Sequence, residues 1–199
     1  MPADRIATVG FDLDMTLVDT AAGIVDTQHA VLCARGVALD RTVLVAEVGV
    51  PVETLFARWL PACDVDDAVA AYRARYAEEG PDRVFAMPGA ADALADLRRR
   101  GVVSAKPAEI IHLVLEQVGL TVDVVVGGLF AEGKAAGLRE HGVQVYVGDH
   151  PGDVSGAREA KARALAVTTG SFDAAQLRAA GADAVLADLT ELSGWLDRA

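Results

Sequence analysis

The chain has 199 residues, of which 52% are hydrophobic, and a formal net charge of −11 at pH 7. This hydrophobic content predicts a compact folded protein and excludes a disordered one. The negative charge argues against nucleic acid and anionic membranes as partners, because both attract basic surfaces. No apolar run approaches the roughly 18 residues of a membrane span, and no signal-peptide pattern precedes the first predicted strand, so we expect a cytoplasmic protein.

The first predicted strand, residues 6–12, runs into two aspartates, Asp12 and Asp14. Residues two apart in a strand point the same way, so we expect both carboxylates on one side. Two negative charges that close are costly unless a cation or a shared proton relieves them. The pattern indicates a metal and acid/base site rather than two turn or cap residues. If Asp12 is a nucleophile, its carboxylate can attack phosphorus, and Asp14 can then transfer protons to and from the reacting oxygens. Mg²⁺ between nucleophile and phosphate would neutralise charge.

Residues 20–83 show no strand pattern and predict several helices. We expect the aromatic residues Trp59, Tyr72 and Tyr76 in the interior of this helical part, because they lie on helical stripes. The loop 47–53 either contacts the substrate or only connects two helices. The first predicted helix has an apolar face that begins at Ile24, and it ends at Gly36. The second has an apolar face of Leu55, Phe56, Trp59 and Leu60 and ends at Pro61. The third has an apolar face from Val65 to Tyr76, with Asp64 as its N-cap.

Four further runs read as strands and alternate with helical patterns: 102–104, 123–127, 143–147 and 164–168. This alternation predicts a parallel α/β sheet. Ligands of such sheets bind beyond the carboxyl ends of the strands, where the polar motifs of this chain fall.

Three residues suit the binding of a phosphate group. Ser104 follows one predicted strand and precedes the helix 108–118, whose first N–H groups can hold an oxyanion, although a turn or cap role fits Ser104 equally well. Lys134 begins a predicted helix, and a cation there conflicts with the positive end of the helix unless an anion lies between them. Lys106 competes for this task, and we favour Lys134; the alternative for either lysine is a solvated surface position.

A second acidic motif, Gly148-Asp149-His150-Pro151-Gly152-Asp153, follows the strand 143–147. Asp149 and Asp153 could share one Mg²⁺ with the first aspartates, since hard cations take oxygen ligands. Capping of a helix by Asp153 explains its position equally well.

In chain order, Asp12-Leu-Asp14-Met-Thr16, Ser104, Lys134 and Gly148-Asp149 to Asp153 resemble the four motifs of the haloacid dehalogenase (HAD) superfamily, within it the phosphatases of the phosphoglycolate phosphatase type. The resemblance covers nearly the whole chain. It implies a Rossmann-like parallel sheet core with an inserted all-helical cap. The core would comprise residues 1–18 and 85–199 and the cap residues 19–84, with hinges near 18–20 and 84–88 and with 47–53 as the substrate-specificity loop.

The resemblance also implies an activity and a role for each motif residue. The protein would be a Mg²⁺-dependent phosphatase, a monomer or homodimer, that hydrolyses a small phosphorylated metabolite through an aspartyl-phosphate. Asp12 and Asp14 would be catalytic, and Ser104 and Lys134 would bind the phosphoryl group. The metal would be held by Asp12, by the backbone carbonyl of Asp14, by Asp149 and by Asp153.

The chain departs from the family pattern at two positions: Met15 stands where Gly is usual, and Ala135 where Pro is usual. A phosphomutase or phosphotransferase of the same family is an alternative, but known mutases place a histidine soon after the first motif, and none lies near Ile24. A phosphoaspartate switch of the receiver type is a further alternative. Receivers have no helical insert, and Asp14 would speed the loss of the phosphate that a switch must keep.

Overall fold

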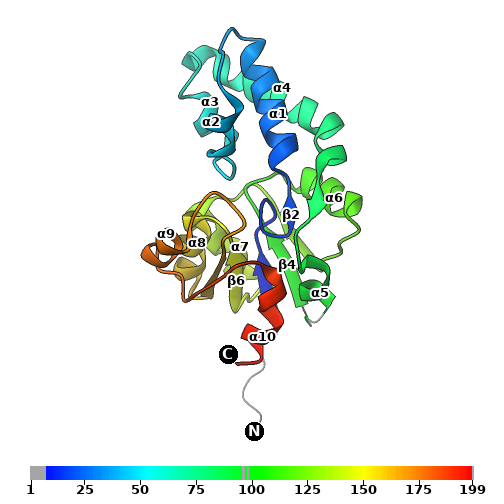
Figure 1. Cartoon of the computed structure of the whole chain (residues 1–199), viewed down its shortest axis with the longest axis vertical. Helices are drawn as coiled ribbons and strands as arrows, with labels where there is room; N and C mark the ends of the chain where they lie inside the picture. Colours follow the sequence, from blue (N-terminus) through cyan, green and yellow to red (C-terminus); the bar gives the residue numbers. More distant parts are fainter. Residues whose placement is uncertain (1–7, 96, 98, 199) are drawn as a thin grey trace.

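The computed structural model describes residues 8–95, 97 and 99–198. Within these ranges the main sheet has six parallel strands in the order β5-β4-β1-β6-β7-β8 (Figure 1). The α/β fold is therefore as predicted, and the two first residues of the predicted strand 6–12 lie outside the described part. The strands are β1 (Thr8–Phe11), β4 (Arg99–Val103), β5 (Val124–Val126), β6 (Val145–Gly148), β7 (Arg163–Val167) and β8 (Ala184–Leu186).

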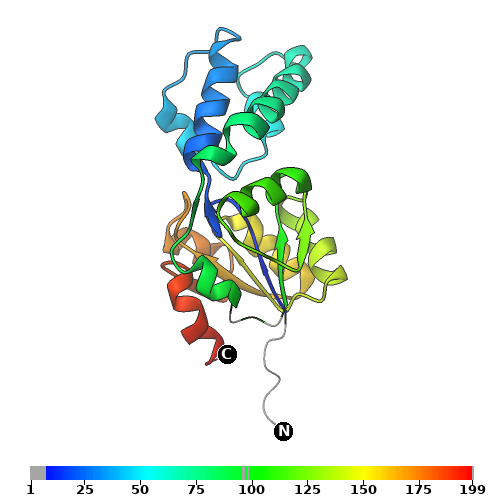
Figure 2. The same cartoon turned by 90° about the vertical axis from the view of Figure 1, so that its right-hand side faces the viewer.

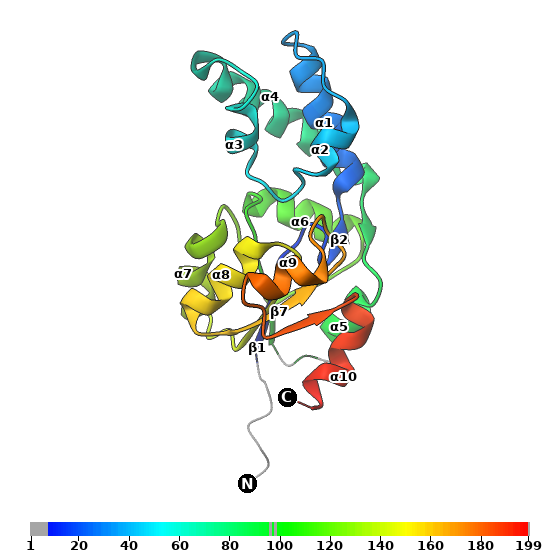
Figure 3. The same ribbon diagram turned by 60° about the vertical axis from the view of Figure 1, so that its left-hand side comes forward.

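Strand residues alternate between two hydrophobic layers, one on each face of the sheet. In β6, Val145 and Val147 belong to one layer and Tyr146 to the other. This alternation follows from the two-residue period of a strand, and it buries both faces under helices, as parallel sheets require. One face is covered by α5 (Ala90–Ala95), α6 (Ala108–Gln117), η3 (Leu189–Glu191) and α10 (Leu192–Leu196); the other by α7 (Lys134–Glu140), α8 (Pro151–Ala160) and α9 (Ala174–Ala179) (Figure 3).

A group of helices lies beyond the carboxyl ends of the strands, at the far end of the molecule from α10 (Figures 1 and 2). It consists of α1 (Ala21–Cys33), α2 (Arg41–Val45), α3 (Val52–Phe56) and α4 (Ala62–Glu79), followed by the short helix η1 (Pro81–Arg83). Leu32, Leu55, Phe56 and Tyr76 form its interior. The absence of strands predicted for 20–83 is confirmed.

Two short segments connect the helical group to the sheet. β2 (Val18–Asp19) and β3 (Phe85–Ala86) pair antiparallel in a separate two-stranded sheet. These are the positions at which we expect hinges, and no local pattern marked them as strands. The pairing holds the two connections side by side, so the helical group is joined to the sheet by a double link.

Two details of the helical group differ from the expectations. Trp59 is 40% exposed and not interior, because α3 ends at Phe56 and the chain then turns, which breaks the helical stripe. The N-cap of α4 is Pro61, and Asp64 lies in the first turn. The positive end of the helix dipole stabilises an acidic side chain at that position. Both cysteines, Cys33 and Cys63, are exposed free thiols. Among the described residues, no helix is at once long and apolar enough to cross a membrane.

Candidate active site

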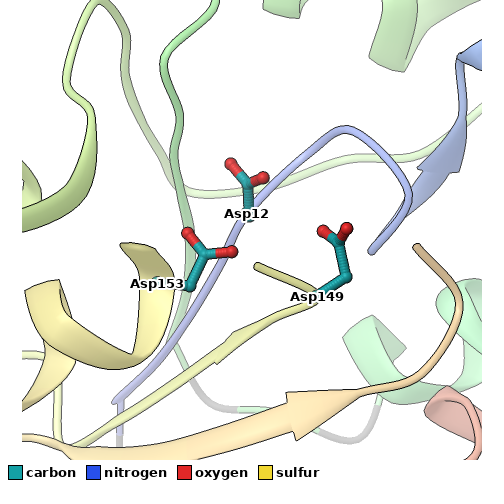
Figure 4. A group of neighbouring side chains, drawn as sticks. All are labelled: Asp12, Asp149 and Asp153. Carbon is teal, nitrogen blue, oxygen red and sulfur yellow. The ribbon is translucent and has the colours of Figure 1, made fainter. Parts of the chain in front are cut away.

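Three aspartates meet at the carboxyl end of the central strands. Asp12 directly follows β1, Asp149 follows the neighbouring strand β6, and Asp153 lies in the first turn of α8 (Figure 4). One carboxylate oxygen of each lies within 4.8 Å of those of the other two. The convergence of acidic side chains from separate strands, which the sequence motifs predict, is therefore present in the fold.

These carboxylates are buried, with Asp12 8%, Asp149 4% and Asp153 3% exposed. The pKa of Asp12 is raised to about 6, mainly by burial; Lys134 acts to lower it, and Asp153 and Asp14 act in the same direction as burial. Burial also raises the pKa of Asp149 well above its usual range, with Asp153 and Asp12 acting in the same direction. When all three carboxylates are ionised, a positive charge is needed nearby to compensate their negative charges.

Lys134 supplies part of that charge from the start of α7. Its Nζ lies 2.9 Å from Asp12 Oδ1 and 2.5 Å from Asp153 Oδ1, and it also lies 3.0 Å from the Tyr146 hydroxyl. Lys134 is thus buried and not a solvated surface residue. The expected conflict with the helix N-terminus is relieved by the two carboxylates themselves. The Tyr146 hydroxyl accepts a hydrogen bond from the Lys134 ammonium and donates one to the carbonyl of Val103. Apart from its position in a strand, nothing in the sequence indicated this role of Tyr146.

Several neighbours hold the acidic side chains in place. The buried hydroxyl of Thr16 donates to Asp149 Oδ1 at 3.0 Å, a role that the sequence did not reveal although Thr16 belongs to the first motif. Asp153 is the third residue of α8 rather than its N-cap, and its Oδ2 accepts the backbone N–H of the N-cap His150. Gly170 leaves room for Asp149, because a Cβ there would lie 1.8 Å from Oδ2.

The donor set fits a divalent cation. Asp12, Asp149 and Asp153 carry three negative charges when ionised, and Lys134 compensates one of them. Hard oxygen ligands with two uncompensated charges match Mg²⁺ in both chemistry and charge. Burial is the main cause that raises the pKa of Asp12 and of Asp149, and the neighbouring carboxylates raise both as well. A cation bound among these side chains would stabilise their ionised forms.

Asp14 does not join this carboxylate group, contrary to the expectation that its side chain would crowd against that of Asp12. The strand ends at Phe11, so the strict alternation ends before Asp14. The Asp14 carboxylate instead accepts from Lys106 Nζ at 2.7 Å and from the buried Thr20 hydroxyl at 2.6 Å. A metal contact through the Asp14 backbone carbonyl remains a prediction.

The second lysine therefore also belongs to the site. Lys106 is buried, and its Nζ lies 4.6 Å from the centre of the Tyr76 ring on α4. Nearby, Ser104 is buried after β4, and its Oγ accepts the backbone N–H of Lys106. Ser104 thus follows the strand adjacent to β1 on the side opposite Asp149.

A cavity of about 100 Å³ opens between the helical group and the sheet. Asp14 and Lys106 line it from the sheet side, and residues 49–53 line it from the helical side. Contact of this segment with a substrate stays a prediction. A wider hollow of about 550 Å³ adjoins it, and the two share Pro51, Glu53, Arg73, Ala105 and Pro107. The remaining lining residues of the smaller cavity are Ile24, Gln28 and Tyr72.

Comparison with known proteins agrees with this arrangement. The family model of haloacid dehalogenase-like hydrolases matches residues 9–167. A probable phosphatase, IndB of Dickeya dadantii, is 31% identical, and the match covers 92% of this chain and 90% of that protein. A phosphoglycolate phosphatase of Agrobacterium fabrum is 31% identical over 82% of this chain and 81% of its own length. A solved structure of a haloacid dehalogenase-like family hydrolase from Streptococcus pneumoniae shares the fold, with a TM-score of 0.87, 24% identity, and coverage of 96% of this chain and 98% of that one.

Proposed function

The chain belongs to the haloacid dehalogenase-like hydrolase family, and from this premise we propose that it is a Mg²⁺-dependent phosphatase of small organic phosphate monoesters. The observation that carries the proposal is the group of three buried carboxylates, Asp12, Asp149 and Asp153, beside the buried cation Lys134. Relatives named phosphoglycolate phosphatase make phosphoglycolate the first substrate to test.

In the first half of the proposed reaction, an oxygen of Asp12 attacks phosphorus. The bond between phosphorus and the ester oxygen breaks, and Asp14 gives its proton to the departing oxygen. In the second half, water attacks the phosphorus of the aspartyl-phosphate and Asp14 takes a proton from that water. The bond to Asp12 then breaks, which releases inorganic phosphate and restores both carboxyl groups.

The surrounding residues bind and orient the phosphoryl group in this scheme. Lys134 lies against Asp12 and can donate to a phosphoryl oxygen, and the Ser104 hydroxyl has its proton available for the same purpose. Mg²⁺ held by Asp12, Asp149 and Asp153 would neutralise phosphoryl charge and orient that group toward Asp12.

We also propose that residues 19–84 act as a cap on a core of residues 1–18 and 85–199. The cavity supports this division, because residues 49–53 of the helical group and the sheet-side residues Asp14 and Lys106 line it together. Closure of the cap would exclude water from the phosphoryl group. The phosphomutase alternative gains no support from the cavity, since the apolar side chain of Ile24 lines it where known mutases place a histidine.

The test is a phosphate-release screen over small phosphorylated metabolites, with and without Mg²⁺, on the wild type and on Asp12→Asn. We expect metal-dependent release that the substitution lowers by about 10⁴-fold or more, because the nucleophile is lost. Asp92→Asn, an exposed aspartate on α5, is the matched control and should retain wild-type activity. Equal release by the Asp12→Asn variant and the wild type would overturn the proposal.

A further inference from the structure

The hydroxyl of Tyr146 is a polar group that the reaction scheme does not use. Its side chain is 1% exposed and belongs to the hydrophobic layer that contains Leu138 and Val154. A phenylalanine would pack in this layer without any polar group to satisfy. The hydroxyl nevertheless has two partners, since it donates to the Val103 carbonyl at 2.5 Å and accepts from Lys134 Nζ at 3.0 Å. Because its only proton is directed at Val103, it can only accept from Lys134.

The Tyr146 ring reaches these partners by crossing the central strand. β6, which carries Tyr146, and β4, which carries Val103, lie on opposite sides of β1. Gly10 of β1 is the register partner of Tyr146, and a Cβ at residue 10 would lie 3.1 Å from Tyr146 Cδ2. The lack of a side chain at Gly10 therefore leaves room for the ring between β6 and β4. Val103 directly precedes Ser104, so the hydroxyl lies beside the segments that carry both predicted phosphate-binding residues.

The contacts of Lys134 already use all of its donors. An ammonium has three N–H groups, and Lys134 Nζ has three acceptors, namely Asp12 Oδ1, Asp153 Oδ1 and the Tyr146 hydroxyl. A phosphoryl oxygen must therefore take the place of one of these acceptors. The two carboxylates are also predicted metal ligands, so their oxygens have an alternative partner. The Tyr146 hydroxyl is neutral and is not a predicted ligand, so its bond to the ammonium is the one that can persist.

We propose that Tyr146 is a positioning residue that acts on the phosphoryl group through Lys134. Its hydroxyl holds the ammonium in place while one N–H group of Lys134 turns from a carboxylate to a phosphoryl oxygen. Without the hydroxyl, only the carboxylates would hold the ammonium, and it would be less well placed for the substrate. The bond to Val103 fixes the hydroxyl itself, so β4 and β6 together set the position of a charge carried by α7. This inference rests on the proposed phosphatase function and adds a residue to it.

A double-mutant cycle tests whether Tyr146 acts through Lys134. The wild type, Tyr146→Phe, Lys134→Met and the double variant are assayed with Mg²⁺ on p-nitrophenyl phosphate, whose leaving group departs without a proton. We expect Tyr146→Phe to lower kcat about 10- to 100-fold in the wild type, the range of a hydrogen bond to a charged group. In Lys134→Met the same exchange should change kcat by less than about threefold, because the ammonium that it positions is absent. Thr27→Val removes another buried hydroxyl that donates to a backbone carbonyl, and as the matched control it should leave kcat unchanged.

Binding of inorganic phosphate gives the same comparison without turnover. In calorimetric titrations with Mg²⁺, the Kd for phosphate should be about tenfold or more higher in Tyr146→Phe than in the wild type. The Kd values of Lys134→Met and of the double variant should agree within about threefold. Gly10→Ala is a second variant for the case that Tyr146→Phe fails to fold, because the added Cβ displaces the ring and leaves the hydroxyl present. It should also raise the Kd of the wild type and not that of Lys134→Met.

Equal losses from Tyr146→Phe in the wild type and in Lys134→Met would assign the hydroxyl a role in packing alone and overturn the inference. Wild-type kcat and Kd in Tyr146→Phe would overturn it as well. Either result leaves the proposed function standing when the wild type releases phosphate in a metal-dependent manner. Absence of phosphate release from any ester by the wild type would remove the proposed function and, with it, this inference.

Discussion

The backbone of Gly170 lies against the carboxylate of Asp149, so close that a Cβ at position 170 would stand 1.8 Å from Oδ2. The loop after β7 thereby positions an acidic side chain that follows β6, the neighbouring strand. Thr16 constrains the same carboxylate through its hydroxyl. The orientation of Asp149 thus depends on three segments far apart in the sequence.

Gly170→Ala should displace the Asp149 carboxylate and weaken metal binding. We expect the Mg²⁺ concentration for half-maximal activity to rise about tenfold or more, as is typical when a partner of a metal ligand is altered. The measurement is a Mg²⁺ titration of phosphate release. Gly194→Ala in α10, where an added Cβ has ordinary space, is the control and should leave the titration unchanged. An unaltered Mg²⁺ requirement in Gly170→Ala would show that Asp149 does not bind the metal.

Met15 adopts a left-handed backbone conformation with φ of 58°, at the position where the family usually has glycine. A side chain in this conformation costs about 1–2 kcal/mol, and glycine avoids that cost. We therefore expect Met15→Gly to be more stable than Met15→Ala by about 1 kcal/mol, the reverse of the usual order of these residues. Urea unfolding of both variants measures the difference. An Ala variant as stable as the Gly variant would mean that the turn relaxes to remove the strain.

The buried Asp12 carboxyl should make the metal-free protein sensitive to pH. Burial raises its pKa from the ordinary 3.8 to about 6, so the folded state binds this proton more tightly than the unfolded state. The protonated Asp12 carboxyl contributes on the order of 3 kcal/mol to the free energy of unfolding. This contribution is complete at a pH below the pKa of Asp12 in the unfolded state, and it is lost as pH rises through about 6. Mg²⁺ binds the ionised form, so its stabilising effect should grow over the same interval.

Urea unfolding of metal-free wild type and Asp12→Asn, between about pH 4 and pH 7, isolates this effect. The asparagine variant cannot ionise at position 12, so its stability relative to the wild type should increase as pH rises. A constant difference between the two proteins over this range would mean that Asp12 titrates at an ordinary pKa.

Removal of the Lys134 ammonium should leave three buried acids without compensation. Lys134→Met is expected to lower the free energy of unfolding by about 3–5 kcal/mol near neutral pH, the usual effect of breaking a buried ion pair. Part of this loss should disappear as pH falls below the raised pKa values of Asp12 and Asp149, because protonation removes their charge. Phosphate release should fall at least about 100-fold.

Lys161→Met provides the control, because Lys161 is exposed. Its backbone is left-handed, and lysine and methionine are both unbranched, so the exchange should not alter the backbone there. Thermal or urea unfolding of both variants at two pH values measures the effect. Wild-type stability of Lys134→Met at neutral pH would mean that the carboxylates there are already protonated.

Local sequence patterns were sufficient to predict the parallel α/β sheet and the edge of the sheet at which the polar motifs gather. Strand periodicity depends on neighbours in the chain, and motifs that follow parallel strands must meet at one edge whatever the strand order. For this reason Asp12, Ser104 and Asp149 could be assigned to one region before any contact was known.

Only the tertiary structure decided which charges pair. It placed Lys134 on Asp12 and Asp153, and Lys106 on Asp14, because these contacts depend on the order of β5, β4, β1 and β6 and on the helical group above them. It also exposed Trp59 beyond the end of α3 and buried Gln28 Oε1 with no hydrogen-bond partner in the described part of the chain. Burial and long-range pairing arise from the packing of segments that are distant in the sequence. A local sequence pattern does not specify which of these segments pack together.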